Sequence, residues 1–343
     1  MQTWSRCLPV PVLVQALLLL AACDEPLHLG SPAPEVADSV FTIAVLPDTQ
    51  AYTQAYPGIY ESQTGWLARE KDPLNLAMVV HEGDLVEASW RLEQWDTARA
   101  AMSLLDDQVP YIIAPGNHDY GRTQEERNAR SRTTHLDTYF PQALFLSMPT
   151  FGGFYDDGAR IDNSYQLFEH GGQRWLVLAL EFGPRMSVLS WANDVLADHP
   201  DHLAIVVTHA YMYPDGTRYD WERLGEAQRY NPKSYPLSDE GSSDGQDIWD
   251  TVVRRHANVV AVLCGHALDD GLGYTVSYGL GEVHEILTNY QMNKHGGGGY
   301  LRLMQFDTAT SQVQVSTYSP WRDDYKRDPD NEFELDYSSH VTR

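Results

Sequence analysis

The sequence predicts an α/β domain, because short apolar runs alternate with segments of helical periodicity through most of the chain. The apolar runs have the composition of strands that are buried on both faces, as in parallel sheets. From Tyr274 onward, strand-like runs follow one another without helices between them, which predicts a second, more antiparallel sheet. With 343 residues, the chain is long enough to bury a substantial core.

Each predicted strand is a short, mostly apolar run, and each predicted helix places its apolar residues on one face. The five buried strands are expected at Phe41–Leu46, Leu76–Val80, Tyr111–Ala114, Leu203–Val207 and Val259–Leu263. The helices are expected at Tyr60–Glu70, Leu92–Leu105, Val188–Leu196 and Gln246–His256. A hairpin is predicted at Gln166–Phe168 and Trp175–Leu180, and later strands at Tyr274–Leu287, Tyr300–Phe306 and Val313–Tyr318.

The first residues are typical of a targeting segment. Arg6 precedes an apolar run, Val12–Leu20, that is too short for a comfortable membrane span. The run ends in Leu20-Ala21-Ala22-Cys23, which resembles the lipobox of bacterial lipoproteins. This resemblance implies a signal peptide over residues 1–22 and a lipid on Cys23 that anchors the protein to a membrane. A plain secretory signal or an uncleaved anchor is the alternative.

The expected domain organisation follows from composition. Residues 23–39 are rich in Pro, Gly, Ser and acidic residues and predict a flexible tether. Residues 40–320 form the expected globular domain, and residues 321–343 an acidic C-terminal tail. With Cys7 in the signal and Cys23 carrying lipid, only Cys264 remains, so the mature domain has no intramolecular disulfide. Cys264 follows a buried run and is expected to be an inert thiol.

The net charge restricts the partners. The chain has 24 Lys and Arg against 48 Asp and Glu, a formal net charge of −24. A surface of that sign repels polyanions, which argues against a nucleic-acid polymer as partner or substrate. It does not exclude a small phosphate ester, because bound divalent cations bring their own local positive charge.

Polar residues follow each of the five predicted buried strands. They are Asp48-Thr49-Gln50, Glu82-Gly83-Asp84, Gly116-Asn117-His118-Asp119, Thr208-His209 and Gly265-His266. The carboxyl ends of α/β strands meet at one crevice, so these side chains should lie close together. Oxygen ligands mixed with imidazole suit Mn, Fe or Zn. One such residue alone is often a helix cap or a core histidine, but five in order predict a metal site.

This ordered set resembles the calcineurin-like metallophosphoesterases, and the resemblance extends from Phe41 to Phe306. A narrower resemblance, to an exported bacterial lipoprotein subgroup with an Asp-Thr-Gln first motif, rests on three segments. These are Leu46-Pro47-Asp48-Thr49-Gln50, Asn289-Tyr290-Gln291 and Thr317-Tyr318-Ser319-Pro320. The family resemblance implies a four-layer sandwich of two mixed β-sheets flanked by helices, with two divalent metal ions at the sheet edge.

The resemblance also implies a role for each motif residue. Asp84 would bridge the two metals, which together lower the pKa of a shared water and clamp the phosphoryl oxygens. Asn117, His209 and His266 would complete one metal position, and Asp48 with Gln50 would serve the other. His118 would protonate the leaving oxygen as general acid. Glu87 is placed to orient His118.

Two departures from the family pattern fall on the same metal position. Gln50 stands where many members have His, and Leu268 stands where the last motif normally ends in a second His. Three outcomes remain open: a substitute ligand, weak filling by a harder ion such as Mg²⁺, or a centre with one metal. The candidate substitutes are Gln291, His295, Asp269 and Asp270.

Other residues are given structural roles. His81 and His284 lie in or beside strands and are expected to be structural. The long segment Tyr211–Tyr235 is rich in aromatic residues and closely follows His209. It is interpreted as a wall facing the substrate, with packing inside the loop as the alternative.

The function predicted from the sequence is hydrolysis of phosphate mono- or diesters by a metal-bound hydroxide at the cell envelope. The alternative is a non-catalytic or sensory domain that binds metal or phosphate through a depleted site. The absence of a basic stripe disfavours a nuclease of long nucleic acids. The particular ester, the native metals and the oligomeric state are not determined by the sequence.

Overall fold

The computed structural model describes residues 39–156, 158, 160–237, 241–269 and 271–341. All of these lie in one compact unit that begins at Val36. The predicted signal peptide, the lipidated Cys23 and the tether up to residue 38 fall outside the described residues. Within the described part of the chain, no helix has the length and apolar character needed to cross a membrane.

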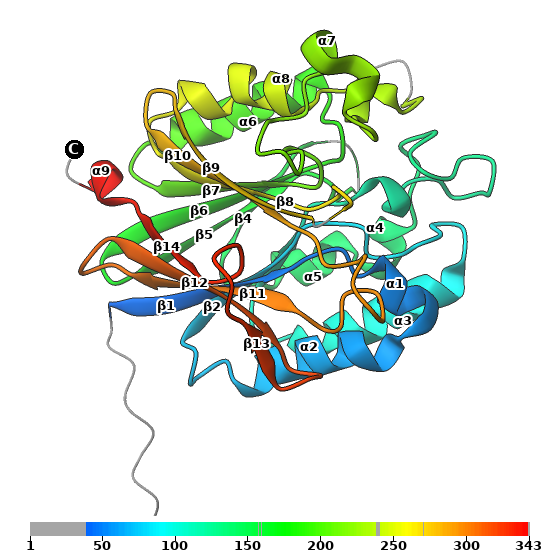
Figure 1. The fold of residues 1–343 in the computed structure, drawn as a ribbon, viewed down its shortest axis with the longest axis horizontal. Coiled ribbons are helices and arrows are strands. Elements are labelled where there is room, and N and C mark those ends of the chain that lie inside the picture. The colour runs from blue at the N-terminus through cyan, green and yellow to red at the C-terminus, as the bar shows by residue number, and fades with distance from the viewer. Residues whose placement is uncertain (1–38, 157, 159, 238–240, 270, 342–343) are drawn as a thin grey trace, which may run out of the picture. The chain divides into compact units, whose positions relative to one another are not determined.

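Two seven-stranded mixed sheets pack face to face in this unit (Figure 1). The first sheet has the order β13 (Asp324–Lys326), β12 (Gln312–Ser319), β11 (Leu301–Asp307), β1 (Val40–Leu46), β2 (Leu76–His81) and β3 (Tyr111–Ile113), with β14 (Phe333–Asp336) paired to β12. The second has the order β4 (Phe151–Phe154), β5 (Ser164–His170), β6 (Gln173–Leu180), β7 (Leu203–Thr208), β8 (Val259–Cys264), β10 (Glu282–Thr288) and β9 (Leu272–Tyr278).

Helices cover the outer face of each sheet (Figure 1). The first sheet is covered by α1 (Gln50–Ala55), α2 (Pro57–Arg69) and α3 (Leu92–Met102), and the second by α6 (Met186–Asp198) and α8 (Gly245–Thr251). The shorter helices are α4 (Leu136–Tyr139), α5 (Gln142–Leu146), α7 (Trp221–Leu224) and α9 (Ser338–Val341). Single 3₁₀ turns occur at Ser103–Leu105, Asn117–Asp119, Gly225–Ala227, Pro232–Ser234 and Val253–Arg255.

Three hydrophobic layers hold the fold together. One lies between the sheets and includes Phe41, Trp175 and Phe306, whose rings contact one another. The second packs α2 and α3 on the first sheet through Tyr60 and Trp95, and the third packs α6 and α8 on the second sheet. The four-layer sandwich of two mixed sheets is therefore confirmed, and the predicted buried strands and long helices are present.

The strands after residue 270 do not form a sheet of their own, and that expectation is wrong. β11 pairs antiparallel with β1, so β11 and β12 extend the first sheet. β10 runs parallel to β8, so β9 and β10 extend the second sheet. In both places the late strands satisfy backbone groups that would otherwise be left open at the edge of a buried strand.

The domain also continues past the expected boundary at residue 320. β14 pairs with β12, from Gln312 opposite Asp336 to Val315 opposite Phe333. Leu335 and Tyr337 are buried in the layer between the sheets. The boundary is therefore corrected: the acidic segment folds because alternate residues in it are apolar and face the core.

Candidate metal centre

The five polar motifs meet at one edge of the sandwich. β1, β2 and β3 are parallel neighbours in the first sheet, and β7 and β8 are parallel neighbours in the second. Each motif follows the carboxyl end of one of these strands, so both sheets deliver polar side chains to the same edge.

Asp84, His209 and His266 form a compact buried cluster there. One ligand atom from each lies within 4.8 Å of the others. His209 Nε2 is 3.2 Å from Asp84 Oδ2 and 3.2 Å from His266 Nδ1. A carboxylate oxygen and two imidazole nitrogens at these separations are a suitable donor set for one divalent cation.

Backbone carbonyls determine which nitrogen of each histidine faces this cluster. His209 Nδ1 lies 2.7 Å from the carbonyl oxygen of Glu82, and His266 Nε2 lies 2.8 Å from that of Tyr230. A carbonyl oxygen only accepts hydrogen bonds, so both of these nitrogens carry hydrogen and donate it. His209 Nε2 and His266 Nδ1 are therefore the nitrogens presented to a metal, and both rings are fixed in orientation.

Asn117 adds an oxygen to the same group. It begins the 3₁₀ turn Asn117–Asp119 after β3 and is 3% exposed. Its Oδ1 is buried and has no hydrogen-bond partner among the described residues. A buried acceptor without a partner costs about 1–3 kcal/mol, unless a cation completes its coordination. The residues at this position thus fit a divalent cation held by Asp84, Asn117, His209 and His266.

The ionisation of the cluster agrees with a site for positive charge. Burial alone lowers the pKa of His209, but the carboxylates of Asp84 and Asp48 outweigh it and raise this pKa to about 9. Burial, together with the nearby charge of His209, lowers the pKa of His266 to about 3. Burial raises the pKa of Asp84, yet His209 and His118 hold it well below its usual value. When no cation is bound, a proton on His209 Nε2 therefore supplies positive charge at the same point.

Two motif glycines leave room for the carboxylates. A Cβ atom at Gly116 would overlap the Asp84 carboxylate, and one at Gly265 would overlap Oδ1 of Asp48. Asp84 and His266 themselves have positive φ angles of 50° and 67°. These conformations, uncommon for residues other than glycine, turn both side chains toward the cluster.

A model of the family described as calcineurin-like phosphoesterase matches residues 41–270. The chain belongs to the calcineurin-like phosphoesterase family. The matched segment contains every motif that follows a parallel strand, from Asp48 to His266.

Relatives and solved structures add context. The uncharacterized protein YvnB of Bacillus subtilis is 33% identical over 296 residues, which are 83% of this chain but only 20% of YvnB. The probable inactive purple acid phosphatase 27 of Arabidopsis thaliana is 39% identical over 49 residues, 14% of this chain and 8% of that protein. The purple acid phosphatase PPD1 of yellow lupin aligns with a TM-score of 0.48 and 15% identity, covering 88% of this chain and 55% of that one.

The second metal position of this calcineurin-like phosphoesterase is built differently. Asp48 accepts two hydrogen bonds, from the backbone N–H of His266 at 3.2 Å and from Nδ2 of Asn289 at 2.9 Å. Burial raises the pKa of Asp48, His209 opposes the rise and Asp84 adds to it, so that the pKa reaches about 7. Asn289 was not among the predicted site residues. The Asn289-Tyr290-Gln291 motif was the available signal, since it accompanies the Asp-Thr-Gln motif.

Gln50 offers this second position one oxygen. Its Nε2 donates to Oε2 of Glu87 at 3.0 Å, so its Oε1 points the other way, buried and without a partner among the described residues. Leu268 lines the cavity that opens over this site and supplies no donor. Of the candidate substitutes, Gln291 lines the cavity, whereas Asp269 pairs with Arg229 at 3.6 Å and Asp270 is outside the described residues. His295 instead contacts the rings of Tyr56 and Trp321.

His118 is oriented by Glu87, but mainly through the backbone of that residue. His118 Nδ1 donates to the Glu87 carbonyl oxygen at 2.7 Å, whereas the Glu87 carboxylate is 4.0 Å away and accepts from Gln50. Glu87 thus contacts the His118 ring mainly through its carbonyl oxygen. The backbone N–H of His118 donates to Asp84 Oδ1 at 2.9 Å, while the bond from Nδ1 to Glu87 leaves Nε2 as the ring nitrogen that can face a ligand.

A cavity of about 280 Å³ opens over these groups. It is lined by Gln50, Asp84, Glu87, Asn117, His118, Asn128, Tyr230, Tyr235, His266, Leu268, Gln291 and Met292. From the predicted aromatic wall, only Tyr230 and Tyr235 reach it. Tyr219 is fully buried and packs against Tyr213 of the same loop, in line with the packing alternative, whereas Tyr211 is buried in the layer between the second sheet and its helices.

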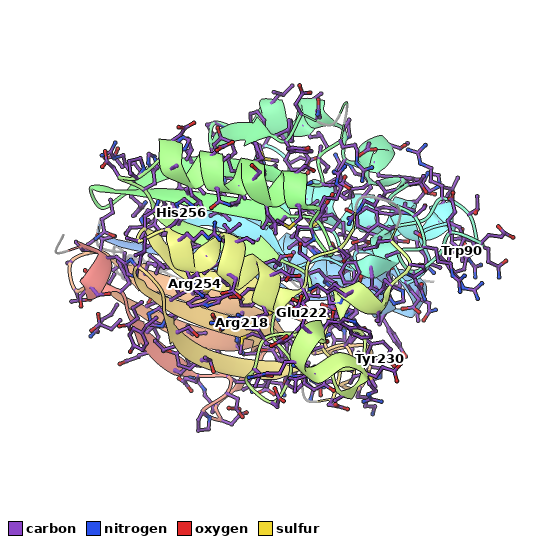
Figure 2. All side chains as sticks on the ribbon, turned by 90° about the horizontal axis from the view of Figure 1, so that it is seen from above. Trp90, Arg218, Glu222, Tyr230, Arg254 and His256 are labelled. Carbon is purple, nitrogen blue, oxygen red and sulfur yellow. The ribbon has the colours of Figure 1, made fainter. Side chains whose placement is uncertain are left out.

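The loop that carries Tyr230 is fastened to the second sheet. Arg218 Nε donates to Glu285 of β10 at 2.9 Å, and the Arg218 guanidinium lies 3.8 Å from the centre of the Trp249 ring in α8. Figure 2 shows Arg218 beside α8, and Tyr230 beyond Glu222 of α7, nearer the edge of the molecule. His81 and His284 use both ring nitrogens in internal hydrogen bonds, in agreement with structural roles.

Proposed function

We propose that this chain hydrolyses phosphate mono- or diesters in a reaction that depends on a divalent cation. The observation that carries the proposal is the cluster of Asp84, His209 and His266, completed by the unpartnered Oδ1 of Asn117. A cation at this position supplies positive charge to the phosphoryl oxygens and lowers the pKa of a water molecule. Membership of the calcineurin-like phosphoesterase family supports the same chemistry.

The chain's own residues complete the reaction. Burial lowers the pKa of His118, but Asp84 and Glu87 outweigh it, so this pKa lies above its usual value. Because Nδ1 donates to the Glu87 carbonyl oxygen, Nε2 is the nitrogen that would donate a proton to the leaving oxygen. The Glu87 carbonyl holds the ring in place during that transfer.

The test measures metal content and turnover on one preparation of the full chain. Paired mono- and diester substrates are assayed with and without added Mn²⁺. Asp84→Asn should abolish turnover. Asp201→Asn is the control: Asp201 lies just before β7 and forms an exposed ion pair with Arg174 of β6, so this variant should behave as wild type. Absence of turnover on both substrates at every metal loading would refute the enzymatic function.

A second candidate is a non-catalytic or sensory domain that binds a metal ion or phosphate. Gln50 and Leu268, which replace two histidine ligands of the family pattern, favour this candidate. It predicts saturable binding of inorganic phosphate without turnover of either ester. Measured turnover that disappears with Asp84→Asn would exclude it.

We further propose that the chain is exported and attached to a bacterial membrane through lipid on Cys23. The support is the Leu20-Ala21-Ala22-Cys23 sequence and the apolar run before it. Cys23→Ala should move the protein from the membrane fraction to the soluble fraction and prevent incorporation of labelled fatty acid. Unchanged incorporation of the label would contradict the proposal.

A further inference from the structure

One part of the cavity lining is apolar, in contrast to the polar part formed by the candidate metal ligands and His118. Tyr230, Tyr235, Leu268 and Met292 contribute aromatic and aliphatic surface. Tyr230 is 45% exposed and Met292 is 64% exposed, so large apolar side chains are presented to solvent at this site. Exposed apolar surface beside a polar, buried base is typical of a site that binds a ligand with one apolar end.

Among the described residues, no lysine or arginine lines this cavity. The two arginines next in sequence to lining residues do not themselves line the cavity, although the Arg229 guanidinium lies 5.8 Å from the centre of the Tyr230 ring. Arg229 pairs with Asp269 at 3.6 Å, and Arg127 donates to the carbonyl oxygen of Gln124 in its own loop at 3.3 Å. A second anionic group on a ligand would therefore find no lysine or arginine side chain in the lining to neutralise it.

The cavity instead contains an extra carboxylate. Glu87 lines it, its side chain is 33% exposed, and its Oε2 is held by Gln50 at 3.0 Å. A carboxylate in the lining repels a negatively charged ligand in the same cavity, and the repulsion is stronger where water is partly excluded. A ligand that carries one negative charge is repelled less by this carboxylate than a ligand that carries two.

We propose that the site selects a phosphodiester with a single negative charge and an apolar or aromatic arm, over phosphomonoesters and over substrates with a second anionic group. This inference rests on the proposed phosphoesterase function and narrows its substrate class. Leu268 contributes twice, because it removes a metal ligand of the family pattern and adds apolar surface beside Tyr230. The arm of the diester lies against that surface, and its phosphate faces Asp84, Asn117 and His118.

The first experiment compares substrates that share one leaving group. Wild-type full chain is assayed on p-nitrophenyl phosphate, methyl p-nitrophenyl phosphate and bis(p-nitrophenyl) phosphate at pH 8. The aromatic diester should have the highest kcat/KM, above the methyl diester, and the monoester should be lower by about tenfold or more. A monoester hydrolysed as well as the aromatic diester would overturn the proposal.

The second experiment measures binding, so it remains informative if turnover fails. Calorimetry compares phenylphosphonate, a dianion at pH 8, with its methyl ester, a monoanion of similar shape. Tighter binding of the monoanion supports the inference even when no ester is hydrolysed, in which case only the proposed function fails. Tighter binding of the dianion overturns the inference whatever the activity.

Two variants assign the selectivity to its residues. Glu87→Gln keeps an acceptor for Gln50 and removes the charge, so the preference for the diester over the monoester should fall by about tenfold. Glu334→Gln removes an exposed charge on β14 and should leave the preference unchanged. Tyr230→Ala retains the carbonyl that holds His266, so metal content should be unchanged while the advantage of the aromatic over the methyl diester disappears. Unchanged ratios in both Glu87→Gln and Tyr230→Ala would overturn the assignment.

Discussion

The two halves of the metal centre differ in how their ligands are held. In the half formed by Asp84, His209 and His266, backbone carbonyls fix both histidine rings, and the ligand atoms already lie within 4.8 Å of one another. In the half formed by Asp48 and Gln50, the backbone N–H of His266 holds one oxygen of Asp48, but side chains on other segments hold its other oxygen and Gln50. The first half is therefore preorganised by the fold, whereas the second depends on a few replaceable side chains.

The difference has a topological origin. Asp84, His209 and His266 follow the carboxyl ends of β2, β7 and β8; β2 is parallel to its neighbours in the first sheet, and β7 and β8 are parallel neighbours in the second. Positions 50 and 268 lie farther along, at the start of α1 and in the turn after β8, where the fold constrains side chains less. The metal-ligating residues at such positions can therefore be substituted without disturbing the sheets.

The largest expected effect comes from removing a ligand of the preorganised half. His209→Ala should lose the tightly bound ion and lower turnover by at least about a hundredfold. Elemental analysis after dialysis measures the metal content. His256→Asn, just before the start of β8 and so at the end away from His266, should retain full metal content. Retention of one tightly bound ion in His209→Ala would show that the tighter position is not the one formed by Asp84, His209 and His266.

Asn289→Ala tests the weaker half alone. Loss of the hydrogen bond to Asp48 Oδ2 should weaken binding of the second cation by roughly ten- to a hundredfold and leave the first unaffected. Titration with Mn²⁺ after the first ion is loaded measures this difference. Equal weakening of both ions would mean that Asn289 supports the whole centre.

Leu268→His should make the cation affinities of the two halves more similar. A histidine at this position restores the ligand of the family pattern and should raise affinity for the second cation by about tenfold. Leu146→His places a histidine on an exposed residue of α5 and should have no such effect. If Leu268→His leaves the second affinity unchanged, Leu268 does not face the Asp48 position.

Proton release gives the smallest but most specific signal. The pKa of His209 is about 9 when no cation is bound, so at pH 8 the first cation must displace nearly one proton from Nε2. The pKa of Asp48 is about 7, so the second cation should release little at pH 8 and more at pH 6, where this carboxyl is protonated. Calorimetry in buffers of different ionisation enthalpy measures both. Identical release by both cations at pH 8 would contradict these assignments.

The sequence was sufficient for the features that follow from local pattern. Apolar runs located β1, β2, β3, β7 and β8, and the polar residues after them do meet at one edge. The carbonyl groups of Glu82 and Tyr230 were not predictable, because every residue has a carbonyl and no side-chain pattern marks its use. The pairing of β11 with β1 was missed for a similar reason, since partners about 260 residues apart leave no local signal.

One strand that was not predicted does have a signal in the sequence. Phe333, Leu335 and Tyr337 alternate with polar residues, which is a strand pattern inside a segment that composition alone described as an acidic tail. Sequence spacing placed Glu87 near His118 but could not show that its carbonyl holds the ring while its carboxylate accepts from Gln50.

The hydrogen bond from His266 to the carbonyl oxygen of Tyr230 has a consequence for protein engineering. The same loop residue that shapes the cavity also determines which nitrogen of a metal ligand is free. Grafting a loop of different length into this region would therefore alter cation affinity together with substrate choice. Side-chain replacements at Tyr230 keep the carbonyl in place, so we expect them to alter ligand selectivity without lowering the affinity for a cation at His266.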